Sequence, residues 1–341
     1  METIELGRTG EHVSRLALGA MQMGSATDED TSVRILDHYR DLGGSFVDTA
    51  DCYEWWSTPG SRGGESEELL GRWLRKGGHR DEMFIATKGS ALPAHSPDLW
   101  AADGTPNWEL ARRTFAGAGA DTLRAAVDGS LRRLGTDRID LYYVHVDDLF
   151  TPLEESLEAL HGLVVAGKIR HIGWSNVRTW RLESIRQLCS RHGWTLPVAV
   201  QQQHSYLRTR GGHDTASIVG GEQLDYLNRH RDQTLVAYSP IVKGIYDDPA
   251  RRAEHWMMEA YAGPDSDARL DAVTTLAAEL GVTPNQLVLA WLFHQTEPPV
   301  LPLIGPRTYE QFTDLLPALD LELDAGHLGR LDRAGFPASA G

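Results

Sequence analysis

The chain has very little cysteine. Cys52 and Cys189 are its only cysteines, and two thiols in 341 residues do not indicate a disulfide framework, so a reducing compartment suits it. We expect Cys52 to be a small buried filler. The sequence also lacks a charged start followed by a long apolar stretch, and no run reaches the length of a membrane span. We therefore expect a cytoplasmic protein with no membrane role.

Positive charge is scarce as well. The chain has 33 Lys and Arg against 48 Asp and Glu, a formal net charge of −15, and it contains no basic run. Because phosphate backbones are bound by clustered Lys and Arg, this charge disfavours a nucleic-acid partner or an anionic membrane surface. A phosphorylated ligand would need a local basic pocket. No low-complexity linker divides the chain, so we expect a single domain over residues 1–341.

Short apolar runs alternate with helical patterns along the chain. Between the runs, apolar residues recur at helical spacing, as at Leu123, Val127 and Leu134. Eight runs, each followed by a helix, favour an α/β fold of the (β/α)₈ TIM-barrel type over two doubly wound domains. The turn after the first run, GAMQMG at 19–24, also lacks the GxGxxG of a Rossmann pyrophosphate turn. The expected strands are residues 16–20, 45–50, 83–88, 139–146, 170–176, 197–202, 234–240 and 300–305.

Three segments fall outside this regular alternation. Residues 4–16 hold two short β-like pieces around glycines, which predict a hairpin that caps the N-terminal end of the barrel. Residues 89–117 and 241–268, after strands 3 and 7, are longer than ordinary connections and carry prolines and aromatics, which favours lids. Elsewhere, Ser66 before two glutamates predicts the start of a helix.

Four polar residues stand at or just beyond the ends of predicted strands: Asp48, Tyr53, Lys88 and His145. Chemistry in such barrels gathers at the C-terminal ends of the strands, so we expect all four at one mouth. A tyrosine hydroxyl, whose pKa is ordinarily about 10, can donate a proton near neutral pH if an ammonium stabilises its anion. Lys88 would supply that charge, Asp48 would keep Lys88 charged, and His145 would orient a substrate oxygen. Taken singly, each residue could instead cap a turn, pack or face solvent.

Several motifs together resemble the aldo-keto reductase family. They follow that family's order across nearly the whole chain: LGRTGEHVSRLALGAM, FVDTADCY, FIATK, IDLYYVH, TPLEESLEALHGLVVAGKIRHIGWSN, VQQQHSY, AYSPIVKG and PLIGPRTYEQ. The resemblance implies that Asp48, Tyr53, Lys88 and His145 form a catalytic tetrad with Tyr53 as the general acid. It also implies a barrel that binds NADPH without a Rossmann motif and reduces a small-molecule aldehyde or ketone to an alcohol, or catalyses the reverse oxidation. The aromatic, proline-bearing loops suit a sugar, an aromatic aldehyde or a polyketide-like natural-product ketone as the substrate.

The same resemblance assigns contacts to the cofactor. Ser175, Asn176 and Gln201 would hydrogen-bond the nicotinamide carboxamide, and Tyr238 would stack on the ring. Arg307, at the start of the last expected helix, suits the 2′-phosphate of NADPH; if it were a plain surface residue, NADH would compete. The other residues assigned to the cofactor are Gly19, Ala20 and Met21, then Ser239, Ile241, Lys243 and Gly244 at the pyrophosphate, and Gly305 and Gln311 at the adenosine end.

The chain departs from the family at two places. Glu54-Trp55-Trp56 follows Tyr53 where many members carry a glycine, and Gln203-His204 stands where many have a tyrosine or phenylalanine. We expect four tryptophans to shape the substrate pocket, namely Trp55, Trp56, Trp100 and Trp108. We expect no metal site, because no second histidine stands at ligand spacing from His145, Asp147 and Asp148.

Two other functions suit a barrel with this tetrad. A cofactor-binding regulatory subunit resembling the potassium-channel beta subunits could keep all four residues, but it needs an exposed apolar docking surface. An epimerase that oxidises and then re-reduces a sugar would instead be marked by tight retention of its cofactor. We rank both below a carbonyl reductase.

Overall fold

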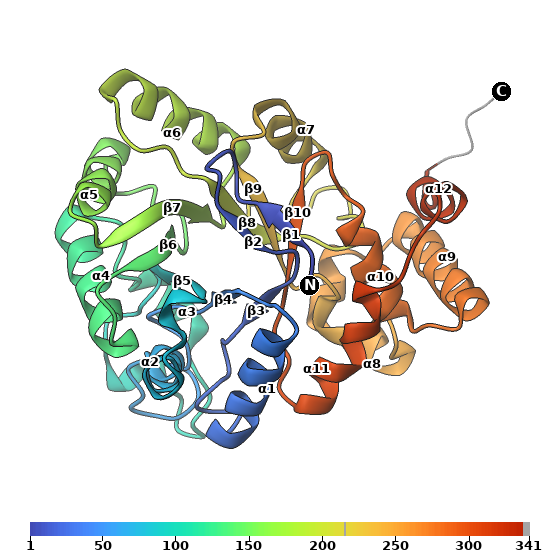
Figure 1. Ribbon diagram of the computed structural model, residues 1–341, viewed down its shortest axis with the longest axis horizontal. Helices are drawn as coiled ribbons and strands as arrows, with labels where there is room; N and C mark the ends of the chain where they lie inside the picture. The colour runs from blue at the N-terminus through green and yellow to red at the C-terminus, as the bar shows by residue number, and fades with distance from the viewer. Residues whose placement is uncertain (215, 337–341) are drawn as a thin grey trace.

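The computed structural model describes residues 1–214 and 216–336, and within them eight parallel strands close into a barrel (Figure 1). The strand order around the barrel is β10-β3-β4-β5-β6-β7-β8-β9. The bounds are β3 (Ala17–Gly19), β4 (Phe46–Asp48), β5 (Phe84–Gly89), β6 (Ile139–Val144), β7 (Ile169–Ser175), β8 (Ala199–Gln203), β9 (Thr234–Tyr238) and β10 (Val300–Ile304). Every predicted strand is present with ends within two residues of those expected, which confirms the (β/α)₈ barrel.

Most barrel strands are rich in apolar residues because both of their faces are covered. All six residues of β5 and all six of β6 are buried. Inward-facing side chains fill the barrel, and among them the rings of Phe46 and Phe84 stack with their centroids 5.1 Å apart. Outward-facing side chains pack under the surrounding helices in a second, larger cluster. Parallel strands covered on two faces read as continuous apolar runs, which is why the sequence reveals them.

Helices follow the strands in sequence and surround the barrel on its outside (Figure 1). Helix α2 begins at Glu65, so Ser66 is not the N-cap that the sequence predicts. The side chain of Ser66 faces the barrel instead, where its hydroxyl donates to the carbonyl of Ala20 at 2.6 Å. Helix α12 was not predicted and follows the helix expected to be last, α11. The long helices are α1 (Glu29–Asp41), α2 (Glu65–Gly77), α4 (Ala120–Leu134), α5 (Leu153–Val165), α6 (Thr179–His192), α7 (Gly221–His230), α9 (Pro264–Leu280), α10 (Pro284–Phe293), α11 (Tyr309–Leu315) and α12 (Ala325–Arg333).

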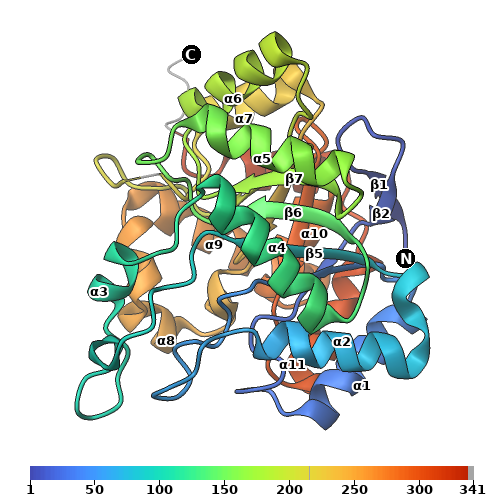
Figure 2. The same ribbon diagram turned by 90° about the vertical axis from the view of Figure 1, so that its left-hand side faces the viewer.

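The predicted N-terminal hairpin is present and lies across one end of the barrel (Figures 1 and 2). Strands β1 (Thr3–Glu5) and β2 (His12–Ser14) pair antiparallel. The amide of Gly7 donates to the hydroxyl of Thr234, the first residue of β9, at 2.7 Å. Gly7 has φ +60°, and a Cβ there would lie 2.6 Å from the carbonyl oxygen of Asp232. Only glycine therefore lets the hairpin approach the barrel this closely.

The two long connections lie at the opposite end of the barrel from the hairpin (Figure 2). Residues 89–117 contain a 3₁₀ turn, η2 (Pro97–Leu99), and a short helix, α3 (Trp108–Arg113). Residues 241–268 contain η3 (Val242–Gly244), α8 (Pro249–Glu254), η4 (Trp256–Ala260) and the first turn of α9. Both segments predicted as loops thus carry short helices. Among the described residues, no helix combines the length and apolarity needed to cross a membrane.

Candidate active site

Four side chains meet at the C-terminal end of three neighbouring strands. Asp48 ends β4, Lys88 lies near the end of β5, His145 follows β6, and Tyr53 lies in the connection after β4. The fully buried Nζ of Lys88 forms an ion pair with Asp48, and it donates to the Tyr53 hydroxyl at 2.9 Å and to the Thr49 carbonyl at 2.8 Å. All three ammonium donors are therefore used. We call Asp48, Tyr53, Lys88 and His145 the tetrad.

Burial sets the protonation states of the tetrad. It raises the pKa of Tyr53 well above 10, and the nearby carboxyl of Asp48 raises it further, so Tyr53 is a neutral hydroxyl. Burial also raises the pKa of Asp48, while the Lys88 ammonium and the Gln201 amide oppose that rise. The pKa of His145 lies well below 6.5 because of burial and then the charge of Lys88. The site therefore contains the neutral Tyr53 phenol, hydrogen-bonded to the Lys88 ammonium, and the neutral His145 imidazole.

Two hydrogen bonds hold the backbone of His145, and two side chains lie against its imidazole. Its amide donates to the carbonyl of Gly89 at 2.8 Å, and its carbonyl accepts from Nδ2 of Asn176 at 2.8 Å. The ring lies edge-on to Tyr53, with centroids 5.6 Å apart. Nδ1 lies 3.4 Å from Sγ of Cys52. Cys52 is buried, as the sequence predicts, but its contact with His145 was not predicted.

Residues expected to bind the nicotinamide lie at the ends of β7, β8 and β9, beside the tetrad. Gln201 donates from Nε2 to the second carboxyl oxygen of Asp48 at 2.8 Å. Asn176, with φ +51°, accepts from the Tyr238 hydroxyl at 2.9 Å and donates to Ser175 at 3.2 Å. These four residues thus extend the tetrad's hydrogen-bonded network around the mouth of the barrel. Left-handed backbone at a non-glycine residue such as Asn176 is often found at functional sites.

The segment after β9 combines backbone strain with positive charge. Ser239, Val242 and Lys243 have φ of +51°, +46° and +62°, and left-handed backbone is costly for a β-branched valine. Arg251 donates to the carbonyl of Lys243 at 2.9 Å. Surrounding protein atoms, and then the charges of Arg307 and Arg251, lower the pKa of Lys243. Three cations therefore gather at the mouth of a chain with a net charge of −15.

The other residues expected at the cofactor, and Arg307 itself, lie at or after the ends of β3, β9 and β10. Arg307 is exposed; its amide donates to Oε1 of Gln311 at 2.9 Å, and its carbonyl accepts from the Thr27 hydroxyl at 3.0 Å. Gly305 is exposed, and Ile241 and Gly244 are half-buried. Gly19 ends β3, and Ala20 and Met21 follow it; the amide of Ala20 donates to the carbonyl of Asp48 at 2.8 Å.

The four predicted pocket tryptophans form one cluster beside Tyr53. The ring centroids are 5.0 Å apart for Trp55 and Trp108, 5.4 Å for Trp56 and Trp108, and 6.0 Å for Trp55 and Trp100. Trp56 approaches Tyr53 edge-on at 6.2 Å. Trp55 is only 2% exposed whereas Trp108 is 41% exposed. Trp55 therefore supports the cluster from beneath, and Trp56 and Trp108 present aromatic surface near Tyr53.

Gln203 and His204, the departure from the family pattern, brace the second long connection. Nε2 of Gln203 donates to the Tyr261 hydroxyl at 2.7 Å, which fixes the end of η4 to strand β8. His204 is buried with its ring 6.5 Å from that of Trp291. Burial and then the charge of Arg269 lower the pKa of His204 to about 4, so the imidazole is neutral.

The carboxylates that follow His145 serve the fold. Asp147 accepts from Trp174 at 3.0 Å and from Arg181 at 3.2 Å. Asp148 accepts from the amide of Ala118 at 2.8 Å. Over residues 1–214 and 216–336, no three ligating side chains gather in a way that could hold a metal ion.

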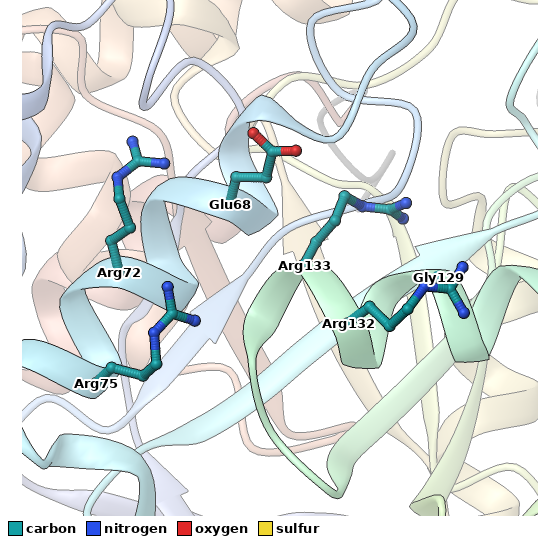
Figure 3. Close-up of a pocket in the computed structure, with 6 residues that line it drawn as sticks. All are labelled: Glu68, Arg72, Arg75, Gly129, Arg132 and Arg133. Carbon is teal, nitrogen blue, oxygen red and sulfur yellow. The ribbon is translucent and has the colours of Figure 1, made fainter.

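A separate groove of about 360 Å³ lies on the outer wall of the barrel (Figure 3). Its side chains come from α2 and α4, and none belongs to the tetrad. Arg133 reaches inward from this groove to the buried carboxylate of Glu67 at 2.6 Å. Glu67 also accepts from the Thr87 hydroxyl at 2.6 Å, one residue before Lys88. The groove is lined by Glu68, Arg72, Arg75, Gly129, Arg132 and Arg133.

Comparison with known proteins agrees with this geometry. The family model described as the aldo/keto reductase family matches residues 15–335. The uncharacterized oxidoreductase YrpG of Bacillus subtilis is 33% identical, with 100% of this chain and 98% of that protein covered. The norsolorinic acid reductase stcV of Emericella nidulans is 31% identical, with 96% and 81% covered. The crystal structure of the thermostable aldo-keto reductase Tm1743, in complex with the inhibitor epalrestat, aligns with a TM-score of 0.70 at 26% identity, covering 98% of this chain and 100% of that one.

Proposed function

Because the chain belongs to the aldo/keto reductase family, we propose that this oxidoreductase uses NADPH to reduce an aldehyde or ketone, with Tyr53 as the proton donor. One observation carries the proposal: the buried Lys88 ammonium contacts Asp48 and the Tyr53 hydroxyl at the same time. A neutral phenol beside a fixed ammonium is suited to giving up a proton, because the phenolate that forms is stabilised where it forms.

The residues present are suited to hold NADPH. Lys243, Arg251 and Arg307 supply the local basic pocket that a phosphorylated ligand needs in this acidic chain. Ser175, Asn176 and Gln201 offer hydroxyl and amide groups for a carboxamide, and Tyr238 offers an aromatic face. In this proposal the basic cluster contacts the phosphates, and the polar network beside the tetrad orients the nicotinamide.

Each tetrad residue then has one task in the reduction. NADPH, when bound, supplies the hydride that adds to the carbonyl carbon. Tyr53 gives its proton to the carbonyl oxygen, which yields the alcohol, and Lys88 stabilises the resulting phenolate. Asp48 keeps the buried ammonium charged. His145, a neutral imidazole beside Tyr53, is placed to donate a hydrogen bond to the same oxygen.

The substrate we favour is an aromatic carbonyl compound. Trp56 and Trp108 present indole surface beside Tyr53, and aromatic rings pack well on one another in offset or edge-on arrangements. The relative named as a norsolorinic acid reductase supports a carbonyl reduction of this kind. We also propose that residues 1–341 form one domain, because the barrel uses strands from Ala17 to Ile304 and α12 packs on α9.

Replacing the proton donor tests the proposal. Tyr53→Phe keeps the ring and removes the hydroxyl, so reduction of an aromatic aldehyde should fall by about 10²-fold or more, as expected for loss of a general acid. NADPH oxidation is followed by absorbance, and cofactor binding is followed by protein fluorescence. Binding should stay within about twofold of wild type because Tyr53 lies on the substrate side of the network. A Tyr53→Phe enzyme with full activity would refute the assignment.

Removing one cation tests the choice of cofactor. Arg307→Ala should weaken NADPH binding by about tenfold or more, since charge-assisted hydrogen bonds to a phosphate are lost. NADH has no 2′-phosphate, so its dissociation constant should hardly change. Arg132→Ala, an exposed arginine on α4 outside the mouth, is the control and should alter neither. Equal weakening of both cofactors by Arg307→Ala would count against a 2′-phosphate contact.

A further inference from the structure

The side chain of Cys52 contacts a ring nitrogen of His145 within the barrel mouth. Its Sγ lies 3.4 Å from Nδ1 of the imidazole, within the range of a hydrogen bond that involves sulfur. No part of the mechanism above uses this thiol. Cys52 immediately precedes Tyr53 in the chain, so its contact with His145 joins two residues within the site.

Both partners of this contact are held in place. Cys52 is 4% exposed, in a small cluster with Ala50, Trp55 and Leu99. Gly63 packs onto its backbone with φ +76°, and a Cβ there would lie 3.1 Å from the Cys52 Cα. The backbone of His145 is hydrogen-bonded through both its amide and its carbonyl. The contact therefore joins two ordered groups.

The direction of the hydrogen bond depends on the protonation of both partners. A neutral imidazole has one proton, on either Nδ1 or Nε2, and the partner of one nitrogen decides which of the two carries it. Burial, and then the carboxyl of Asp51, raise the pKa of the Cys52 thiol well above 9, so the thiol keeps its proton. The Lys88 ammonium disfavours a second positive charge on the ring. A protonated thiol beside a neutral ring can donate from Sγ to Nδ1, and in that arrangement the ring proton lies on Nε2.

We propose that Cys52 is a positioning residue whose thiol donates a hydrogen bond to Nδ1 of His145 and so keeps the imidazole in its Nε2–H tautomer. Nε2–H is then the group available to donate to a substrate oxygen. The opposite tautomer would present a lone pair to that oxygen and repel it. The effect on turnover rests on the proposed reductase function, whereas the tautomer belongs to the protein without substrate.

Three substitutions separate hydrogen bonding from packing. Cys52→Ser keeps a donor, Cys52→Val fills the space without a donor, and Cys52→Ala removes both. The tautomer is read from the ¹⁵N chemical shifts of His145, which are assigned by their loss in His145→Gln. Turnover of an aromatic aldehyde, NADPH binding and thermal unfolding are measured on the same samples.

Wild type and Cys52→Ser should show the Nε2–H tautomer and similar turnover numbers. Cys52→Val and Cys52→Ala should show mixed tautomers and a kcat lower by about five- to tenfold, the effect of one neutral hydrogen bond, with NADPH binding unchanged. A wild-type spectrum with the Nδ1–H tautomer would overturn the proposal without any variant. So would a Cys52→Val protein that keeps both the Nε2–H tautomer and full kcat. If wild type turned over no carbonyl compound, the reductase function would fail while the ¹⁵N spectra still decided the role of Cys52.

Discussion

At the scale of single residues, Asp51 shows how strongly burial acts in the loop that carries the site. Its side chain is buried beside the carboxylate of Glu67, and within the described part of the chain its Oδ1 has no hydrogen-bond partner. Burial, and then the charge of Glu67, raise the pKa of Asp51 to about 8. The folded protein therefore holds Asp51 protonated at neutral pH, whereas the unfolded chain ionises it.

This raised pKa gives a stability that depends on pH. The neutral carboxyl of Asp51 makes its full contribution to the free energy of unfolding below about pH 3.9, the pKa of an aspartate in the unfolded chain. That contribution is lost as the pH rises towards the folded-state pKa of about 8. The free energy of unfolding of wild type should therefore fall, relative to that of Asp51→Asn, by up to about 1.4 kcal/mol per pH unit over this window. Urea unfolding at several pH values between 4 and 8 measures the difference.

The exposed Asp137 is the matched control for Asp51. Asp137→Asn should give an unfolding free energy that runs parallel to that of wild type across the same pH range, because substitutions at exposed sites change stability little. If the Asp51→Asn curve also ran parallel to wild type, Asp51 would not be protonated in the fold at neutral pH.

The sequence anticipates some residue contacts and not others. Asp48, Lys88 and His145 were predicted to converge because all three stand at the ends of adjacent parallel strands, and the structure brings them together with Tyr53. The bonds from Gln201 to Asp48 and from Cys52 to His145 were not predicted. Both depend on how side chains point from strand ends and a loop, which neither composition nor periodicity encodes.

At the scale of secondary-structure elements, α2 and α4 are joined by an ion pair that supports β5. Arg133 of α4 reaches Glu67 of α2 at 2.6 Å, and Glu67 also accepts from Thr87 of β5. The Glu67 carboxylate is fully buried, so it depends on these partners for its charge to be tolerated. The pair thus braces the strand that presents Lys88.

Breaking this pair from one side should cost more than an ordinary arginine substitution. Arg133→Ala leaves the Glu67 carboxylate buried without its cation, and the free energy of unfolding should fall by about 2 kcal/mol or more. Arg132→Ala, the exposed neighbour in the same groove, should change it by less than about 0.5 kcal/mol. Denaturant unfolding of both variants provides the comparison. Equal, small losses would show that Glu67 does not depend on Arg133.

Secondary-structure elements were predictable where burial on both faces enriches a segment in apolar residues, and short helices without such a pattern were missed. All eight barrel strands were found, because parallel strands covered on both faces carry short segments rich in apolar residues. The short helices α3 and α8, of six residues each, were expected as loops. Helices this short have too few turns to show a periodic apolar face, and their stability comes from tertiary packing.

At the scale of the whole molecule, the N-terminal hairpin and the candidate active site lie at opposite ends of the barrel. The hairpin covers one end, and α3 and α8 lie towards the other (Figure 2). The tetrad, the tryptophan cluster and the basic cluster of Lys243, Arg251 and Arg307 come from the C-terminal ends of the strands and the connections that follow them. The net charge of −15 did not predict that basic cluster, because it is assembled from residues far apart in the chain. A barrel brings such residues together at one rim.

We propose that hydride passes from NADPH to a carbonyl carbon at this mouth. The most direct measurement uses NADPH with deuterium at the reactive position of the nicotinamide, an aromatic aldehyde and mass spectrometry of the product. We expect an alcohol with one deuterium on the carbinol carbon from wild type, and almost no alcohol from Tyr53→Phe. An alcohol without deuterium, or bound NADPH that reduces no carbonyl compound, would contradict the account.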